Sequence, residues 1–292
     1  MGHRSGFVNI LGNPNVGKST IMNALVGEKL SIVTPKAQTT RHRILGIVNG
    51  DDFQIVYSDT PGILKPRYGL HEVMMTYVST AIIDADLILY VTDVSEKPVE
   101  NNKYLSKIRD SGIPVIIAIN KIDLSNQADL EELVGLWRQG FPLSSVIPIS
   151  AREGFNLDSL LACVLGKLPE APPYFPKDQL TDKYARFFAS EIIREKILTN
   201  YKKEIPYSVE IEIESFLEEK NLTRIRAVIH VARESQKGII IGHNGSRLKK
   251  VGTEARKDME DFFGKKIYLE LYVKVTKDWR DRQSSLKRFG YR

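Results

Sequence analysis

Residues 12–19, Gly-Asn-Pro-Asn-Val-Gly-Lys-Ser, have the residue types and the spacing that bind a polyphosphate. The two glycines let the backbone of this loop curve closely around a polyphosphate, so that consecutive N–H groups point inward at its oxygens. Lys18 is placed to neutralise the β and γ phosphates of a nucleotide, and Ser19 is placed to ligate Mg²⁺. The apolar run Phe7–Leu11 precedes the loop and the helix-forming run Thr20–Leu25 follows it. A strand before and a helix N-terminus after favour a phosphate-binding loop over an ordinary glycine-rich turn.

A second polar segment, Asp59-Thr60-Pro61-Gly62, follows the strand-like run 53–58. A carboxylate at Asp59 can hold Mg²⁺ through the water shell of the ion. The Gly62 N–H can contact a γ-phosphate and so sense its presence. We therefore expect this segment to complete the phosphate site.

Residues that can recognise a base follow the next strand-like runs. Asp123, in Asn120-Lys121-Ile122-Asp123, can accept hydrogen bonds from the N1–H and N2–H₂ groups of guanine. Adenine lacks this pair of donors, and burying an unmatched carboxylate is costly. Lys121 can lay its stem over the base, and the Ala151 N–H, just after the run 145–149, can donate to guanine O6. The ligand is therefore expected to be GTP or GDP.

Nucleotide contacts are thus expected from four segments, each at the end of a strand. Their members are Gly12, Asn13, Pro14, Asn15, Val16, Gly17, Lys18, Ser19, Thr20, Asp59, Thr60, Pro61, Gly62, Asn120, Lys121, Asp123, Ser150, Ala151 and Arg152.

The elements that must position these residues alternate between strand-like and helix-like over residues 7–165. This alternation predicts a mostly parallel sheet covered by helices on both faces. Several prolines then mark a stiff linker. We expect an α/β domain over residues 1–168, a proline-rich linker over 169–182 and a second domain over 183–292 that ends in a basic helix.

Charge is distributed unevenly along the 292 residues. Residues 1–180 carry 17 Lys and Arg against 19 Asp and Glu, whereas residues 181–292 carry 25 against 17. A basic excess of this kind is typical of a polyanion-binding surface, and a solvated basic face is the alternative. The single cysteine excludes a disulfide framework and favours a reducing cytosol. We expect no signal peptide and no membrane-spanning segment.

The second domain follows the pattern α-β-β-α-α-β, and its last two helices are joined by Gly242-His243-Asn244-Gly245. A GxxG loop in this place lets a nucleic-acid backbone approach closely. Lys249 and Lys250 follow on the next helix and can contact phosphates, while Ile240 and Ile241 can line an apolar groove for unstacked bases. This combination predicts RNA binding.

The tail of the chain mixes aromatic and cationic residues. Trp279 and Arg280 can stack on bases and contact phosphates, and docking of Trp279 on its own domain is an equally good alternative. The expected RNA contacts are Ile241, Gly242, His243, Asn244, Gly245, Lys249, Lys250, Trp279 and Arg280.

Residues 6–167 resemble the small GTPase superfamily, through the loop 12–19 and the polar segments that follow it. The resemblance maps a switch threonine, a Mg²⁺ ligand when GTP is bound, to the segment 38–42. Either Thr39 or Thr40 can fill this role, and we favour Thr40. The Mg²⁺ ligands are then Ser19, Thr40 and Asp59. The residues expected to act in hydrolysis are Lys18, Thr40, Gly62 and Asn15.

One position departs from the Ras-like pattern. Ile63 follows Gly62, where Ras-like enzymes carry the glutamine that orients the attacking water. Isoleucine cannot orient water, so either intrinsic hydrolysis is slow or another element places the water. In GTPases with an apolar residue here, an asparagine at the position of Asn15 can help to bind K⁺. The resemblance therefore implies hydrolysis that K⁺ stimulates.

Residues 183–292 resemble a type II KH domain, so the expected fold class is an α/β P-loop GTPase domain followed by an α+β KH domain. The whole chain resembles the Era family of bacterial ribosome-assembly GTPases. That resemblance implies a monomer that binds small-subunit ribosomal RNA near its 3′ end and acts in assembly of the small ribosomal subunit. It also implies a cytoplasmic protein with peripheral association with the inner membrane.

Two other functions fit the same residues. One is a GTP-gated RNA chaperone or regulator with a non-ribosomal RNA target. The other is a GTPase whose KH-like domain binds protein and whose basic face is idle.

Overall fold

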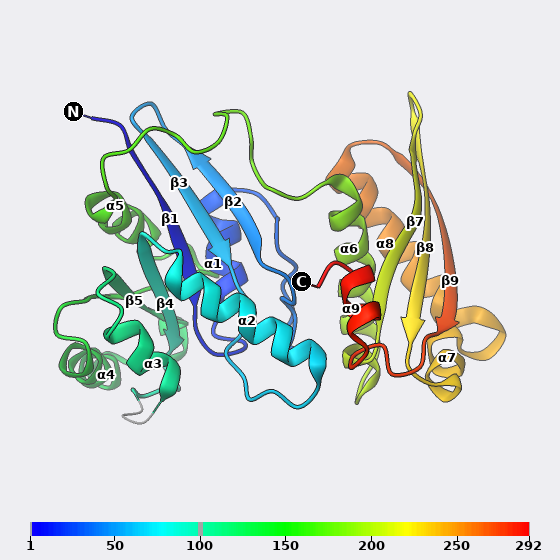
Figure 1. The fold of residues 1–292 in the computed structure, drawn as a ribbon, viewed down its shortest axis with the longest axis horizontal. Helices are drawn as coiled ribbons and strands as arrows, with labels where there is room; N and C mark the ends of the chain where they lie inside the picture. The colour runs from blue at the N-terminus through cyan, green and yellow to red at the C-terminus, as the bar shows by residue number, and fades with distance from the viewer. Residues whose placement is uncertain (1, 99–101, 292) are drawn as a thin grey trace. The chain divides into compact units, whose positions relative to one another are not determined.

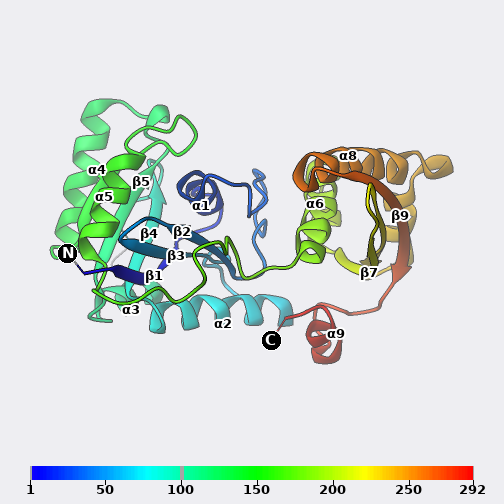
Figure 2. The same cartoon turned by 90° about the horizontal axis from the view of Figure 1, so that it is seen from above.

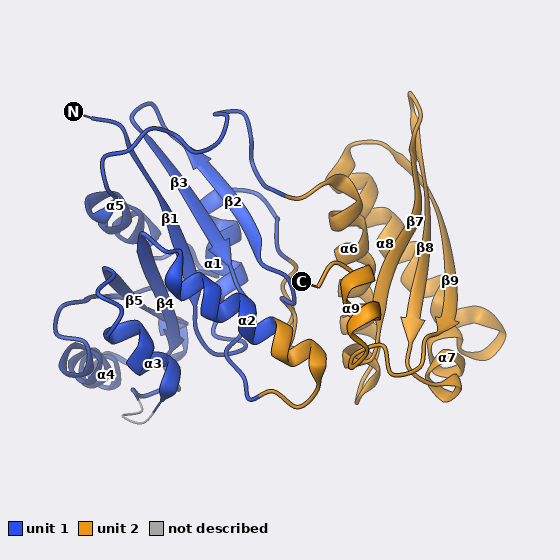
Figure 3. Cartoon of the chain, in the orientation of Figure 1, with its two compact units in different colours: residues 1–31, 40–65, 74–182 blue, residues 32–39, 66–73, 183–292 orange. Residues whose placement is uncertain are grey.

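The computed structural model describes residues 2–98 and 102–291, which form two compact units (Figure 3). Unit 1 contains residues 1–31, 40–65 and 74–182, and unit 2 contains residues 32–39, 66–73 and 183–292. The main division of the chain lies between Asp182 and Lys183. Two short segments from the first half of the sequence nevertheless belong to unit 2, which the sequence pattern did not indicate. None of the helices in the described ranges is long and apolar enough to cross a bilayer.

Unit 1 is built on a six-stranded sheet with the order β2-β3-β1-β4-β5-β6 (Figure 1). All neighbouring strands are parallel except β2 and β3, which form an antiparallel hairpin. The mostly parallel α/β sheet predicted from the alternating pattern is therefore confirmed. The strands are β1 (Arg4–Leu11), β2 (Ile44–Asn49), β3 (Phe53–Asp59), β4 (Leu87–Asp93), β5 (Val115–Asn120) and β6 (Ser145–Pro148).

Helices cover both faces of this sheet, with α1 on one face and α2 on the other (Figure 2). The central strands β4 and β5 are buried along their whole length, because a parallel sheet between two helix layers has no solvated face. The helices are α1 (Lys18–Val26), α2 (Gly69–Ile83), α3 (Lys103–Arg109), α4 (Gln127–Gly140) and α5 (Leu157–Lys167). The loops after β1, β3, β5 and β6 leave the carboxyl ends of their strands, where ligands of open α/β sheets bind.

The proline-rich segment predicted as a linker, residues 169–182, belongs to unit 1. The Gln54 side chain donates to the carbonyl of Phe175 at 2.8 Å and accepts the N–H of Tyr174 at 2.7 Å. Farther along, the N–H of Ile47 donates to the carbonyl of Leu180 at 2.8 Å. This segment is therefore fastened to the β2–β3 hairpin over much of its length, and it satisfies backbone groups at the edge of the sheet.

Unit 2 contains a three-stranded sheet with the order β7-β8-β9. Strands β7 and β8 are antiparallel, whereas β8 and β9 are parallel. The element order α-β-β-α-α-β agrees with the pattern expected for a type II KH domain. The elements are α6 (Ala185–Asn200), β7 (Glu210–Glu218), β8 (Leu222–Val231), α7 (Glu234–Ile241), α8 (Ser246–Phe263), β9 (Lys266–Val275) and α9 (Gln283–Arg288).

The core of unit 2 lies between one face of this sheet and helices α6, α7 and α8. Ile211 and Ile213 of β7 share this face, as their alternation with glutamates predicts. A bulge between Ile213 and Ser215 shifts the register of β7 against β8. The extra residue brings Phe216 back to the core face, although strict alternation would have turned it away.

Candidate nucleotide and RNA sites

The loop between β1 and α1 has the backbone geometry that its glycines permit. Gly12 has φ of +149° and Gly17 has φ of +100°, values that favour glycine. A Cβ on Gly12 would lie 2.1 Å from the carbonyl oxygen of Val91, and a Cβ on Gly17 would lie 2.2 Å from the Asn120 side chain. At Gly12 the backbone of Val91, and at Gly17 the side chain of Asn120, therefore lies too close for any residue with a Cβ. The loop leads directly into the N-terminus of α1, and backbone N–H groups at a helix N-terminus favour the binding of anions.

Lys18 is buried at the first position of α1 and folds back over the loop. Its Nζ donates to the carbonyls of Gly12 at 3.1 Å and Asn13 at 2.7 Å. Burial lowers the pKa of this lysine to about 8, against the opposing effects of Asp59 and Glu96. Burial destabilises the charged ammonium, and the two carbonyls that it contacts are neutral. A phosphate in their place would stabilise the ammonium by its negative charge.

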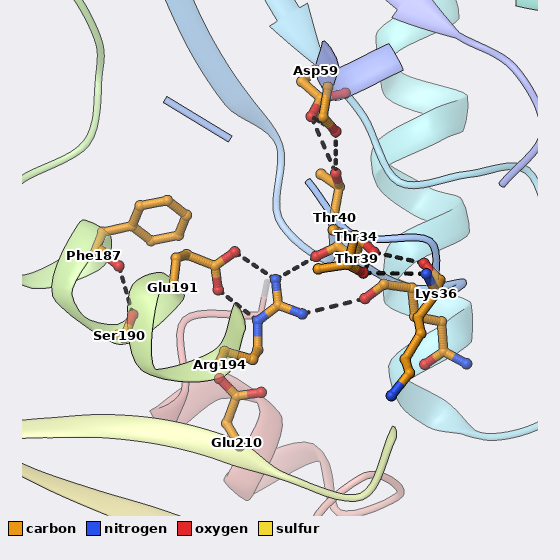
Figure 4. A network of polar contacts seen from close by, with 12 residues as sticks. Thr34, Lys36, Thr39, Thr40, Asp59, Phe187, Ser190, Glu191, Arg194 and Glu210 are labelled. Atoms are coloured by element: carbon orange, nitrogen blue, oxygen red, sulfur yellow. Dashed lines mark hydrogen bonds and ion pairs between the residues drawn. The ribbon is translucent and has the colours of Figure 1, made fainter. Parts of the chain in front are cut away.

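Three side-chain oxygens converge beside this lysine. The Ser19 Oγ lies 2.8 Å from the Thr40 Oγ1 and donates to the Asp59 Oδ2 at 2.7 Å. The Thr40 hydroxyl also donates to the same Asp59 oxygen, at 3.1 Å (Figure 4). The structure thus brings together the three predicted Mg²⁺ ligands from α1, the segment before β2 and the end of β3.

The chemistry of these groups fits a magnesium ion that is shared with a polyphosphate. Asp59 is fully buried, and its Oδ1 has no hydrogen-bond partner among the described residues. Burial raises the pKa of Asp59, although bonds from Ser19 and the charge of Lys18 oppose the rise. A divalent cation would stabilise the carboxylate. The described residues contain no cluster of three or more His, Cys, Asp or Glu, so phosphate and water oxygens would have to complete the shell.

Residues 59–62 lie against the phosphate loop, as expected for a γ-phosphate sensor. The Thr60 hydroxyl donates to the carbonyl of Ile10 at 2.7 Å, and the Ile63 N–H donates to the carbonyl of Gly12 at 3.1 Å. A Cβ on Gly62 would lie 2.8 Å from the backbone of Pro14. The Ile63 side chain is buried, so no polar group at this position faces a reacting water.

Asn120 connects the base-recognition turn to the phosphate loop. Its Nδ2 donates to the carbonyl of Val16 at 2.8 Å, and its Oδ1 accepts the N–H of Ala151 at 3.0 Å. Lys121 has φ of +61°, and its Nζ pairs with Asp93 at 2.6 Å. Burial alone would raise the pKa of Asp93, but the bonds from Lys121 and Ser95 outweigh it and lower the pKa.

The proposed guanine acceptor, Asp123, is exposed and oriented by a neighbour. Its Oδ1 accepts a hydrogen bond from the Ser150 Oγ at 2.6 Å, while Ser150 itself is buried. The segments 120–123 and 150–152 thus meet at the ends of β5 and β6. Arg152 extends into solvent, with its side chain 85% exposed.

Other predicted nucleotide residues occupy both buried and exposed positions. Val16 is buried, whereas Asn15 is exposed with φ of +66°. Asn13 donates from its side chain to Glu96 at 3.0 Å.

Sequence reasoning did not identify Glu96 or Asp93 as neighbours of the site, because neither lies in a recognisable motif. Asp93 is the last residue of β4 and Glu96 lies three residues farther on, at the carboxyl end of a strand like the other segments, and this position was a signal in the sequence.

The predicted RNA loop of unit 2 is a tight turn between α7 and α8. Gly242 has φ of +71°, Asn244 +49° and Gly245 +74°. His243, Lys249 and Lys250 are exposed. A Cβ on Gly242 would lie 2.7 Å from the Arg247 Cγ, so a side chain there would crowd the start of α8.

Two of the hydrophobic residues considered for RNA contact have other roles. Trp279 is fully buried, and its Nε1 donates to the carbonyl of Ser208 at 3.0 Å. The alternative, docking on its own unit, is therefore what the structure has, and the expected stacking of Trp279 on bases is wrong. Ile240 lies in the core of unit 2, so it cannot line a groove for bases, whereas Ile241 is half-buried. Ile239, at 38% exposed, is the apolar surface residue of this turn of α7.

Two family models match the chain. The model described as a 50S ribosome-binding GTPase matches residues 7–121, and the KH domain model matches residues 204–280.

Curated relatives match over the whole length. The GTPase Era of Alkaliphilus metalliredigens is 42% identical over 294 residues, which cover 100% of both chains. The GTPase Era of Syntrophus aciditrophicus is 45% identical over 291 residues, covering 99% of this chain and 95% of the relative.

Solved structures agree with these matches. A crystal structure of Era in complex with MgGDPNP and nucleotides 1506–1542 of 16S ribosomal RNA is similar with a TM-score of 0.94 and 40% identity over 99% of each chain. A structure of an Aquifex aeolicus Era variant bound to GDP·AlF4⁻ has the same TM-score, identity and coverage.

Proposed function

This chain belongs to the Era family of GTPases, and we propose that it is a GTP-hydrolysing switch that binds small-subunit ribosomal RNA near its 3′ end. It is a GTPase that converts GTP to GDP and phosphate, with Mg²⁺ as its cofactor. We further propose that it acts in assembly of the small ribosomal subunit.

The observation that carries the GTPase part of this proposal is the convergence of Ser19, Thr40 and Asp59 beside the buried Lys18. Ser19 and Thr40, with Asp59 acting directly or through the water shell, would hold Mg²⁺, and the ion would supply positive charge to the phosphate oxygens. The Lys18 ammonium exchanges its carbonyl partners for phosphate oxygens. The Gly62 N–H contacts the γ-phosphate, and the charge that develops in the transition state is stabilised by these fixed donors.

We propose that Asn15 contributes to hydrolysis through a bound K⁺, because the buried Ile63 offers no polar group to a water. Asn15 is exposed within the phosphate loop, which supports its access to an ion from solvent. The test is the GTPase rate in K⁺ and in Na⁺ buffers, for the native chain and for Asn15→Ala. Faster hydrolysis in K⁺ that disappears in Asn15→Ala supports the proposal, and equal rates in both buffers contradict it.

The proposed RNA contacts are Ile241, Gly242, His243, Asn244, Gly245, Lys249, Lys250 and Arg280. The exposed lysines at the start of α8 and the close backbone approach at Gly242 support RNA as the ligand. Crosslinking in cells, followed by sequencing of the bound RNA, tests the target. Recovery of mainly small-subunit ribosomal RNA supports the proposal, whereas mainly messenger RNA would favour a regulator with a non-ribosomal target.

A protein ligand for the KH domain would differ in its salt dependence. Phosphate contacts make log K fall steeply with log salt concentration, because each one releases condensed counterions. A steep slope therefore supports RNA. A monomeric state, a cytoplasmic location and peripheral association with the inner membrane stay predictions from the sequence.

A further inference from the structure

Two short segments from the first half of the sequence belong to unit 2. Residues 32–39 and 66–73 group with α6 and the C-terminal part of the chain (Figure 3). Thr39 is the last residue of the first segment, and the next residue is Thr40, the proposed Mg²⁺ ligand. Whatever fixes the backbone at Thr39 therefore acts one peptide bond away from the metal site.

Arg194 in α6 fixes this backbone directly (Figure 4). Its guanidinium donates to the carbonyl of Gln38 at 3.3 Å and to the carbonyl of Thr39. One turn earlier, the Glu191 carboxylate accepts from the Nε of Arg194 at 2.7 Å and from its Nη2. The side chains of Arg194 and Glu191 are 1% and 8% exposed. The carboxylate balances the buried charge, and the planar guanidinium has further N–H groups for the two carbonyls.

Other contacts in unit 2 hold the same segment. Gln38 has φ of +58°, a conformation that a residue with a side chain keeps only where its surroundings impose it. The Tyr68 hydroxyl donates to the Gln38 Oε1 at 3.0 Å. At the other end, the Lys36 Nζ donates to the carbonyls of Leu198 and Tyr201 at the C-terminal end of α6. Hydrogen bonds with other residues of unit 2 therefore fix the conformation of segment 32–39 at Lys36 and at Gln38.

The second segment is held by the C-terminal part of unit 2. The Gly69 N–H donates to the Asp281 Oδ1 at 3.0 Å, and the Leu70 N–H donates to the carbonyl of Arg280 at 2.8 Å. The Arg280 guanidinium lies 4.6 Å from the centre of the Tyr68 ring, a cation–π distance. Tyr68 thus links the two segments, because its hydroxyl bonds to Gln38.

We propose that Arg194 is a positioning residue for the GTPase reaction, which sets the backbone of Gln38 and Thr39 so that Thr40 is presented to Mg²⁺ when GTP is bound. This inference rests on the proposed role of Thr40. A switch threonine ligates Mg²⁺ with GTP and not with GDP, so the contact from α6 favours the triphosphate selectively. A purely structural role of Arg194 in unit 2 would not distinguish the two nucleotides.

The experiment measures the affinities of the full chain for fluorescent GDPNP and fluorescent GDP across a series of Mg²⁺ concentrations. For Arg194→Met we expect GDPNP to bind about tenfold more weakly, within the usual range for coupled sites, and GDP to bind within about twofold of the native affinity. Half-maximal binding of GDPNP should also need more Mg²⁺. Lys196→Met is the matched control, because it removes an α6 cation whose ion pairs are with Glu195 and Asp258.

Arg194→Lys keeps the charge beside Glu191 but lacks the planar fork, so we expect it to show the same selectivity loss in smaller degree. Should Arg194→Met fail to fold, this variant decides the question. Three results would overturn the inference: an equal loss of affinity for GDPNP and GDP, no loss of affinity for either, or the same selective loss in Lys196→Met.

Thr40→Ala separates this inference from the proposed function. Selective loss of GDPNP affinity in Thr40→Ala, with little further loss when Arg194→Met is added, supports both. If Thr40→Ala leaves GDPNP binding unchanged, Thr40 is not the Mg²⁺ ligand and the proposal falls with it. If Thr40→Ala is selective but the two Arg194 variants are not, the proposed function stands and the role of Arg194 is wrong.

Discussion

The side-chain amide of Asn120 donates a 2.8 Å hydrogen bond to the carbonyl of Val16, which lies 104 residues earlier in the phosphate loop. The same side chain accepts the N–H of Ala151. A single buried amide therefore ties together three segments that come from the ends of different strands. The sites for base and for phosphate share this residue, so they should respond together when it is changed.

Asn120→Ala tests this relationship. The substitution leaves the Val16 carbonyl and the Ala151 N–H without their partner, which should lower the free energy of unfolding by about 2–4 kcal/mol. We expect affinity for GTP and for GDP to fall together, as measured by fluorescent nucleotide titration beside urea denaturation. Asn126→Ala is the control, since it removes the N-cap of α4 at a cost of about 1 kcal/mol. Native nucleotide affinity in Asn120→Ala would contradict the bridging role.

Gly12→Ala tests the close approach in the phosphate loop. The new Cβ would lie 2.1 Å from the Val91 carbonyl oxygen, at a φ that side chains rarely adopt. We expect a loss of about 2–4 kcal/mol in unfolding free energy and loss of nucleotide binding. Gly27→Ala is matched to it, because Gly27 has φ of +81° but nothing within 4 Å of its Cβ. Backbone strain alone should cost this control about 1 kcal/mol and spare nucleotide binding. Similar losses in both variants would mean that strain, not crowding, dominates.

The lowered pKa of Lys18, about 8 because of burial, predicts two opposite responses to pH. Between pH 8 and the ordinary pKa of 10.5, the unfolded chain binds more protons at Lys18 than the folded chain does. The contribution of Lys18 to the stability of the nucleotide-free protein should therefore rise with pH across this window. Phosphates need the charged form, so nucleotide affinity should fall above pH 8, approaching about tenfold per pH unit.

The measurement is urea denaturation without nucleotide, and GDP titration, at a series of pH values from 7 to about 10. In Lys18→Met, the pH dependence of the unfolding free energy and of the GDP affinity should both lose the contribution of this lysine. Any pH dependence that comes from titration of the nucleotide itself should remain. Identical pH slopes in the native chain and in Lys18→Met would show that Lys18 does not titrate in this range.

Gly242→Asp tests the RNA loop of unit 2. A carboxylate at φ of +71° would add strain, crowd Arg247 and repel phosphates, so RNA binding should be lost while GTP binding is retained. Gly238→Asp is the control. It adds the same charge four residues earlier, at a position where a new Cβ would have nothing within 4 Å. Loss of RNA and GTP binding together would point to misfolding instead. Equal loss of RNA binding in the control would point to charge rather than to loop geometry.

Much of the nucleotide site could be predicted because its motifs are local. The loop 12–19 and the segments 59–62, 120–123 and 150–152 each follow a strand, and parallel strands bring their carboxyl ends to one edge of a sheet. The alternation in β7 was less reliable. The bulge between Ile213 and Ser215 adds one residue to the strand, and such an insertion leaves no mark in hydrophobic periodicity.

The sequence by itself determined which residues we propose for the chemistry: a phosphate loop, a carboxylate for guanine, three magnesium ligands and a basic GxxG unit. Those features depend on residue types at short spacing, and the backbone allows few ways to arrange them. Only the tertiary structure decided that Trp279 and Ile240 are buried, and that Arg194 of α6 bonds to the backbone of Gln38 and Thr39. Burial and pairing between residues more than 150 positions apart depend on packing of the whole unit, which no local pattern encodes.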